Sequence, residues 1–314
     1  MPSYAFSFST VPAWVTDLLE DRLPYSLVLL RRLQFTKFND GTTPHARIIF
    51  VSDIDDLGVL EAGSRQPTMF TAAYLDFSEG PDTEMFLYST LHADQQQQSS
   101  IEYEEQLGSF LQETSRIREE YGKDTAFGNQ VLVGALQTEV RRAFERLGRV
   151  QQRPFGYYDK WLFNVHELPQ FDESLPNGMY WDEATLDDCH VIVSKTEIPR
   201  IAEALMRHPN LVIRLEDKTP IAWALLGLDG SLISLHCEEA YRRKGLAKTL
   251  AGKLMRQSMA EYGRGAWGSA DVSATNDGSR GMCKALNGKI HWEVSCNDAA
   301  HTAQGVCDTG AEIG

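Results

Sequence analysis

The segment from Gly230 to Tyr262 constrains the fold of this chain most, because strand, turn and helix patterns follow one another there without a break. Side chains from Leu232 to Cys237 alternate between two sets, the two-residue period typical of a strand covered on both faces. An acidic stretch and a basic turn come next. Leucines then recur every fourth position, the pattern of a helix with one apolar stripe, at Leu246, Leu250 and Leu254.

The turn inside this segment has the composition of an anion-binding site. It contains three cations and a glycine in a row, Arg242, Arg243, Lys244 and Gly245. The first N–H groups of a helix have no partner within the helix, the helix dipole adds positive charge, and glycine lets the backbone approach a ligand closely. We therefore predict a site for a polyphosphate-like anion; the alternative is an ordinary helix start with solvated charges.

The pattern Arg242-x-x-Gly245-x-Ala247 between a strand and a helix resembles the pyrophosphate-binding motif of the GNAT superfamily of N-acetyltransferases, whose ligand is acyl-coenzyme A. More narrowly, Trp223 in TPIAWALL, the turn DGS and the run LHCEEAYRRKGLAKTL resemble the glycine N-acyltransferase branch. The resemblance implies an α/β fold with a mixed central sheet flanked by helices. It also implies acetyl-coenzyme A or another acyl-coenzyme A as co-substrate.

The length of 314 residues exceeds what one core usually fills, which predicts two domains. We expect a first domain at residues 1–168, a catalytic acyl-coenzyme A-binding GNAT domain at 169–297, and a disordered tail at 298–314. The proline- and acid-rich run HELPQFDESLPN is the expected linker. The first half repeats the element order without an R-x-x-G-x-A turn, and its glycine nearest the expected helix start is Gly134, which has no basic flank. We therefore predict a tandem in which the N-terminal GNAT-like domain is degenerate.

The net charge of −14 argues against two classes of partner, because an acidic protein repels both nucleic acid and anionic membranes. No segment approaches the roughly 20 apolar residues that span a bilayer. Coenzyme A is itself an anion, so a protein of this charge must gather cations locally to bind it. Arg242, Arg243, Lys244 and Lys248 do so within one short segment.

The five cysteines are odd in number and widely spaced, with no C-x-x-C pair: Cys189, Cys237, Cys283, Cys296 and Cys307. This usage fits a reduced compartment and argues against a disulfide framework and a structural zinc, so we predict no metal. The N-terminus shows neither a basic n-region nor a continuous apolar stretch. We expect a cytoplasmic protein, either monomer or homodimer.

The resemblance also implies which residues hold the coenzyme. The pantetheine arm is expected to pair with the strand at Leu235, His236 and Cys237. The pyrophosphate is expected on the N–H groups of Arg243, Lys244, Gly245, Leu246 and Ala247, with Arg242 positioning the loop and Lys244 or Lys248 near the 3′-phosphate. Asn276 and Ser279 match an N-x-x-S helix start whose side chains approach the coenzyme in this family; the alternative is a plain N-cap.

The residues that move protons differ from the family pattern. Glycine N-acyltransferases place a glutamate base early in the strand, but that position is Ser231, which puts glycine as the acceptor in doubt. His236 is the titratable residue within the strand and the candidate base, acting directly or through water; the alternative is a packed histidine. The tyrosine that donates a proton to the departing thiolate is replaced by Cys283, which either serves as that acid or is only a buried small residue.

These observations predict an N-acyltransferase that moves an acyl group, acetyl by default, from coenzyme A to a small-molecule primary amine or amino acid by direct attack in a ternary complex. The missing glutamate and tyrosine leave a non-catalytic acyl-coenzyme A-binding module as one alternative. A protein lysine acetyltransferase is the second alternative, and transfer to oxygen is a third.

Overall fold

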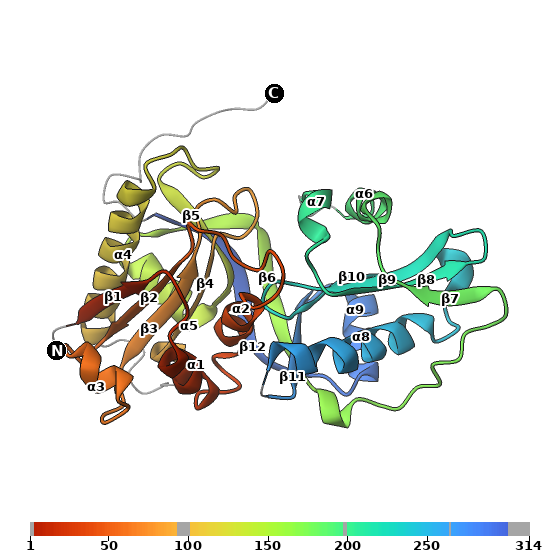
Figure 1. Cartoon of the computed structure of the whole chain (residues 1–314), viewed down its shortest axis with the longest axis horizontal. Helices are drawn as coiled ribbons and strands as arrows, with labels where there is room; N and C mark the ends of the chain where they lie inside the picture. The colour runs from red at the N-terminus through yellow and green to blue at the C-terminus, as the bar shows by residue number, and fades with distance from the viewer. Residues whose placement is uncertain (1–2, 93–100, 197–199, 264, 301–314) are drawn as a thin grey trace. The chain divides into compact units, whose positions relative to one another are not determined.

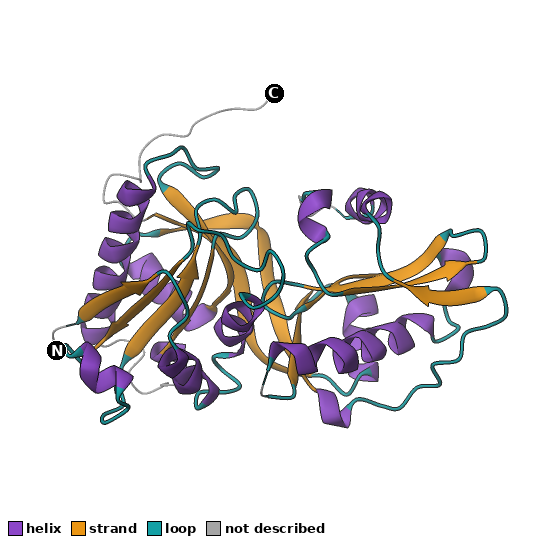
Figure 2. Ribbon diagram, viewed as in Figure 1, coloured by secondary structure: helices purple, strands orange, loops and turns teal. Residues whose placement is uncertain are grey.

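The computed structural model describes residues 3–92, 101–196, 200–263 and 265–300 of the chain, as helices layered on β-sheets (Figures 1 and 2). It divides into two compact units, neither of them continuous in sequence. Unit 1 consists of Met1–Leu18, Thr43–Gly156 and Ser295–Gly314, and unit 2 of Leu19–Thr42 and Tyr157–Val294. The sequence had predicted a single cut at residue 168.

Unit 1 is built on a sheet in which four antiparallel strands are followed by a parallel one, and the sheet continues from there through β12 (Lys289–Ala300) and β6 (Val150–Asn164). Its strands pair in the order β1 (Tyr4–Phe8), β2 (Arg47–Ser52), β3 (Phe70–Leu75) and β4 (Met85–Ser89), and β5 (Gln130–Gln137) runs parallel to β4. The helices are α1 (Ala13–Glu20, which extends into unit 2), α3 (Leu57–Glu61), α4 (Ile101–Tyr121) and α5 (Thr138–Arg146). Alternate residues of β2 serve the two faces: Ile49 and Val51 join the core under α4, whereas Phe50 receives the edge of the Trp14 ring from α1.

Gly134, the glycine nearest the helix start expected from the sequence, does not lie in a turn. It lies inside β5, where an added Cβ would stand 2.7 Å from Thr83 Cγ2, so close packing is what requires a glycine there. The chain between β4 and α4 in unit 1 includes the segment ADQQQQSS (residues 93–100), which lies outside the described residues. That segment contains neither a glycine nor a basic residue, so its sequence has none of the groups that make the later turn attractive to a diphosphate.

Unit 2 contains a four-stranded antiparallel sheet and a separate strand pair. The sheet has the order β10 (Leu232–Cys237), β9 (Pro220–Leu226), β8 (Asn210–Leu215) and β7 (Met179–Asp182). Helices α6 (Leu186–Ser194) and α7 (Ala202–Leu205) lie on one face and α8 (Leu246–Tyr262) on the other (Figure 1). The strand pair is β11 (Trp267–Ser273) against β6 (Val150–Asn164), and α9 (Asp277–Ala285) and β12 (Lys289–Ala300) follow β11. The predicted α/β architecture of a mixed sheet between helices is confirmed.

Two strands pass through both units. The unit boundaries after Gly156 and after Val294 fall inside β6 and β12. The strand β12 continues to Ala300, so the first residues of the predicted tail are part of it, and residues 301–314 lie outside the described chain. Among the described helices, none is long and apolar enough to cross a membrane.

A buried helix from the first forty residues belongs to unit 2. Every residue of α2 (Leu27–Phe35) is buried, including Arg31 and Arg32. Arg31 Nη2 donates to the carbonyl oxygens of Gly265 at 2.7 Å and Trp267 at 2.9 Å, which fixes the start of β11. Desolvation lowers the pKa of the Arg31 guanidinium to about 10, yet these acceptors satisfy it as a cation at neutral pH.

Helix α6 is tied to the sheet of unit 2 by a buried ionic cluster. Thr185 and Asp188 form a reciprocal capping box at its N-terminus. Both oxygens of Asp188 accept from Arg214 of β8, whose Nε also donates to Asp182 at 2.7 Å. The Arg214 side chain is only 5% exposed, so its charge depends on these partners.

We expect Asp188→Ala to lower the free energy of unfolding by about 3 kcal/mol, because it leaves a buried guanidinium short of a partner. Burial opposes ionisation of Asp188, but hydrogen bonds from Arg214 and Thr185 outweigh it and lower the pKa of that carboxyl. A lowered folded-state pKa stabilises the protein above the unfolded value of about 3.9, and the gain is lost as pH falls through the folded-state pKa.

Urea unfolding from pH 7 to pH 3 checks this prediction, with Asp187→Ala as the matched control. Asp187 occupies the same helical turn but is exposed. The difference between wild type and Asp188→Ala should shrink toward acid pH. Equal losses for the two variants at pH 7 would show that the cluster contributes nothing beyond the helix dipole.

Candidate functional site

The parallel strands β10 and β11 diverge from a single point of contact. Ser231 and Ser269 form an isolated parallel bridge. Beyond it, β10 pairs with β9 and β11 pairs with β6, and the described residues show no further pairing between β10 and β11. The edge of β10 from Leu232 to Cys237 therefore faces a gap between the two strands, and its backbone groups on that side are free to pair with an extended ligand.

A bulge interrupts β10 where the gap begins. Ile233 pairs with Leu225 and His236 with Trp223, so β10 has one residue more than β9 over this stretch. Ser234 adopts a φ of 51°, in the left-handed region. The strict alternation expected from the sequence is therefore wrong here. Ile233 and His236 lie on the same face of the sheet, although they are three residues apart.

The turn after β10 presents unpaired backbone donors to open space. Within the described chain, the N–H groups of residues 243–247 have no hydrogen-bond acceptor. Arg243 has a φ of 64° and Gly245 a φ of 84°, and left-handed residues in such a turn direct successive N–H groups toward one point. An added Cβ at Gly245 would meet nothing within 4 Å, so the space beside this residue is open.

The cations around this turn are not neutralised by carboxylates. Arg242 Nε donates to the Cys237 carbonyl oxygen at 2.9 Å, which ties the turn to the end of β10. Lys244 Nζ lies over the Tyr241 ring and Lys248 Nζ over the Phe171 ring, at 5.2 Å and 5.8 Å from the ring centres. In the part of the chain that the structure describes, neither these three residues nor Arg243 forms an ion pair. Their positive charge is therefore available to an anion.

The start of α9 has the predicted cap. Asn276 Oδ1 accepts from the Ser279 N–H at 3.0 Å. Both residues are exposed, so the capping role does not prevent either side chain from meeting a ligand. Further along α9, the Cys283 side chain is buried, and desolvation raises the pKa of its thiol to about 12. A thiol so placed is a poor acid near neutral pH, which favours the interpretation as a packing residue.

His236 is held by an aromatic ring and a carboxylate. Its ring stacks on Trp223, with 4.4 Å between centroids and 19° between planes. Its Nε2 is buried and lies 3.4 Å from Glu238 Oε1, in a geometry that does not meet hydrogen-bond criteria. Desolvation lowers the pKa of His236, and the nearby Glu238 only partly offsets this. The imidazole is therefore mostly neutral at pH 7 and can accept a proton.

Sequence reasoning missed the contact of His236 with Glu238. Glu238 Oε1 also lies 3.1 Å from Lys195 Nζ, which follows α6. The spacing of His236 and Glu238 was a usable signal, because residues two apart at the end of a strand point the same way. The contribution of Lys195 could not be seen in the sequence, since it depends on how α6 packs.

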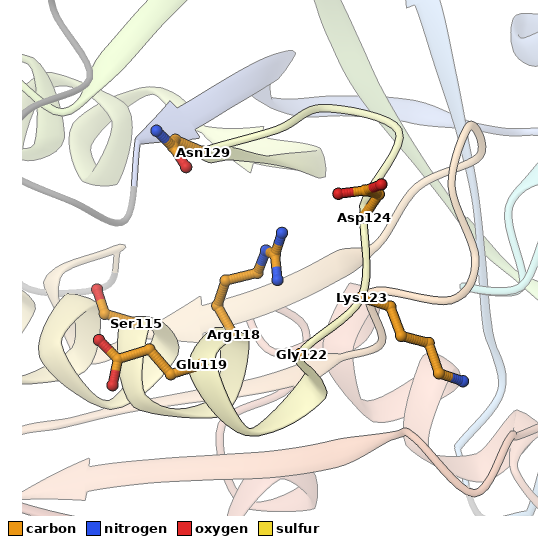
Figure 3. Close-up of a pocket in the computed structure, with 7 residues that line it drawn as sticks. All are labelled: Ser115, Arg118, Glu119, Gly122, Lys123, Asp124 and Asn129. Atoms are coloured by element: carbon orange, nitrogen blue, oxygen red, sulfur yellow. The ribbon is translucent and has the colours of Figure 1, made fainter.

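A cavity of about 340 Å³ lies elsewhere, in unit 1, at the end of α4 and the loop that follows (Figure 3). Its lining mixes both signs of charge and includes none of the predicted site residues: Ser115, Arg118, Glu119, Gly122, Lys123, Asp124 and Asn129. Among the described residues, no group of three His, Cys, Asp or Glu side chains is arranged to hold a metal ion.

Comparison with known sequence families matches the two halves of the chain separately. Residues 7–161 match the acyl-CoA N-acyltransferase verG N-terminal domain, and residues 166–288 match the acetyltransferase (GNAT) family. No curated protein matches the chain. The change from one match to the next falls close to the boundary expected from the sequence.

Two solved structures share the fold across nearly the whole chain. A Drosophila protein superposes with a TM-score of 0.59 at 13% identity, over 91% of this chain and 94% of that one. A tandem GNAT protein from the clavulanic acid biosynthesis pathway gives a TM-score of 0.53 at 9% identity, over 96% of this chain and 100% of that one. At identities this low, the similarity shows only that the fold is shared.

Proposed function

Because residues 166–288 belong to the acetyltransferase (GNAT) family and the chain is an acyl-coenzyme A-dependent N-acyltransferase, we propose that it transfers an acyl group to a small-molecule primary amine. Acetyl is the default donor group. The amine attacks the thioester directly while both substrates are bound. No covalent enzyme intermediate is needed, because the thioester is already an activated acyl group.

The single observation that carries this proposal is the turn at residues 243–247. Unpaired N–H groups converge on an open space, and cations without carboxylate partners surround it in a protein of net charge −14. Backbone donors and cations together suit a diphosphate better than water, since charge-assisted hydrogen bonds are the strong ones. Residues 243–247 would hold the pyrophosphate, and Arg242 would position their loop through the Cys237 carbonyl.

The pantetheine arm fits the open edge of β10. Its two amides would pair with backbone groups at Leu235, His236 and Cys237, as an added strand does. The thioester end then lies toward the bulge at Ser234, where the strands have begun to separate. Asn276 and Ser279 are the exposed residues at the start of α9 that we propose to meet the coenzyme from the other side.

His236 is the proposed base. The amine nitrogen forms a bond to the thioester carbon and loses a proton, while the carbon–sulfur bond breaks and the sulfur leaves as thiolate, which must then be protonated. Since Nε2 faces the Glu238 carboxylate, a proton on Nε2 leaves the lone pair of Nδ1 to accept the amine proton, directly or through water. The Cys283 thiol is too buried to serve as this acid, so we assign protonation of the thiolate to water or to the imidazolium of His236, which has taken the amine proton.

We expect the purified enzyme to release free thiol when a panel of amines is offered with acetyl-, benzoyl- and phenylacetyl-coenzyme A. Small amines should be acylated in preference to lysine peptides, and transfer should show ternary-complex kinetics. Micromolar coenzyme A binding without thiol release from any amine would favour the binding-module alternative. Activity on lysine peptides alone would favour the protein acetyltransferase.

A further inference from the structure

A buried ion pair lies beside the diverging strands and plays no part in the reaction described so far. Asp271 of β11 stands directly opposite Lys160 of β6, and Lys160 Nζ lies 2.7 Å from Asp271 Oδ1. The Lys160 side chain is fully buried, whereas 27% of the Asp271 side chain is exposed. The lysine therefore cannot reach a ligand, but the carboxylate above it can.

The face on which Asp271 lies follows from strand alternation. Asp271 is two residues beyond Ser269, which forms the bridge to Ser231, and Ile233 is two residues beyond Ser231. Ile233 packs on the core that contains Trp223, and His236 stacks on Trp223. Asp271 and His236 are thus on the same face, on opposite sides of the gap. Two residues along a strand cover about 7 Å, so Asp271 is close to the point where the gap opens.

The electrostatics of this carboxylate suit a cationic ligand. Desolvation raises the pKa of Asp271, Lys160 opposes that effect, and buried Asp229 adds to it. The charge of Lys160 is already matched by Asp271, so a ligand carboxylate would be repelled by the Asp271 carboxylate. A ligand ammonium would instead form a charge-assisted hydrogen bond with the Asp271 carboxylate, which is partly exposed but has lost much of its hydration.

We propose that the Asp271–Lys160 pair selects the acceptor: the exposed carboxylate binds a second ammonium group of the amine, so the preferred substrates are diamines or related polycations without an α-carboxylate. The nitrogen that attacks must be neutral, so the charge that docks on Asp271 belongs to the far end of the molecule. Lys160 is a positioning residue that fixes the carboxylate. This inference rests on the proposed function, and it narrows the acceptor from any small amine to a cationic one.

The test compares 1,5-diaminopentane, pentylamine and lysine, which differ by one ammonium or one carboxylate, together with diamines of three to six carbons. Wild type should acetylate one of the diamines with a KM at least tenfold below that for pentylamine or lysine. In Asp271→Asn the KM for that diamine should rise at least tenfold, while the KM for acetyl-coenzyme A and turnover of pentylamine stay unchanged. A structural role would move all of these values together.

Two further variants show whether a loss of discrimination between amines comes from misfolding or from loss of the Asp271 carboxylate. Asp271→Asn leaves a buried lysine unpaired, so the double variant Asp271→Asn/Lys160→Met removes both charges and must show the same loss of discrimination. Asp159→Asn is the matched control, because Asp159 also lies on β6 in an ion pair, with Arg280, but on the opposite face. It should leave the KM for the diamine unchanged, and thermal melts report whether each variant is folded.

Calorimetric titration of the diamine into protein saturated with coenzyme A separates this inference from the proposed function. Binding that is lost in Asp271→Asn supports the inference even if no thiol is ever released, in which case only the transferase assignment falls. Equal diamine binding by wild type and Asp271→Asn, or KM values for all the diamines equal to that for pentylamine, overturns it.

Discussion

Gly245→Val is expected to weaken coenzyme A binding at least 100-fold, equivalent to about 2.8 kcal/mol at 1.4 kcal/mol per tenfold. Two effects act together. A β-branched side chain resists the left-handed backbone that Gly245 adopts at a φ of 84°, and its methyl groups would occupy the space that the N–H groups of the turn face. Isothermal calorimetry with coenzyme A measures the loss.

Gly178→Val is the matched control for that variant. Gly178 has a φ of 81° and also has nothing within 4 Å of an added Cβ, but it lies before β7, far along the chain from the turn. Both variants should lose similar stability, and only Gly245→Val should lose the coenzyme. Lys244→Glu should weaken binding as well, whereas Lys37→Glu, an equal change of charge at an exposed site, should not. Normal affinity of Gly245→Val would refute the assignment of the turn.

His236→Ala is expected to reduce kcat by about 10²- to 10⁴-fold, the usual contribution of a positioned general base, with little change in coenzyme A affinity. Steady-state kinetics with an accepted amine, beside calorimetry with coenzyme A, separates the two quantities. His190→Ala is the control, since His190 is an exposed histidine on α6. Undiminished turnover of His236→Ala at neutral pH would leave the ring as a packed residue only.

The pH profile provides a second readout of the same residue. Desolvation places the pKa of His236 below its ordinary value of about 6.5, so the basic form exists at lower pH than for a free histidine. The rate should therefore rise with pH through a midpoint below 6.5 and stay level near neutrality. The fall in rate toward acid pH that His236 causes should be absent in His236→Ala. Any fall caused by protonation of the acceptor amine should remain.

The strand, turn and helix around Gly245 were predictable because their signals are local. The strand β10 spans Leu232 to Cys237 and α8 begins at Leu246, as alternation and the leucine stripe indicated. The glycine does adopt a conformation that side chains resist, and the cap at Asn276 is present. Each of these features depends on residues within a few positions of one another, which is the range over which propensity and periodicity act.

Features set by distant packing could not be predicted. The bulge at Ser234 exists because β10 must follow β9, and the sequence of β10 alone reads as regular alternation. The place of α2 in unit 2 depends on Arg31 reaching the carbonyl oxygens that precede and begin β11. Lys160 falls within the first domain expected at residues 1–168, and only the pairing of β6 with β11 places it against Asp271.

The path of β6 through both units also limits where the chain can be divided into fragments. A fragment beginning after the proline-rich linker would retain the turn at residues 243–247, yet β11 would have lost its antiparallel neighbour β6, and α8 would have lost α2. Asp271 would be stripped of its counter-ion, and a long hydrogen-bonding edge would be bare to other chains. We therefore expect proteins cut or recombined at the proline-rich linker to aggregate. Insertions and tags are better placed at exposed loop tips.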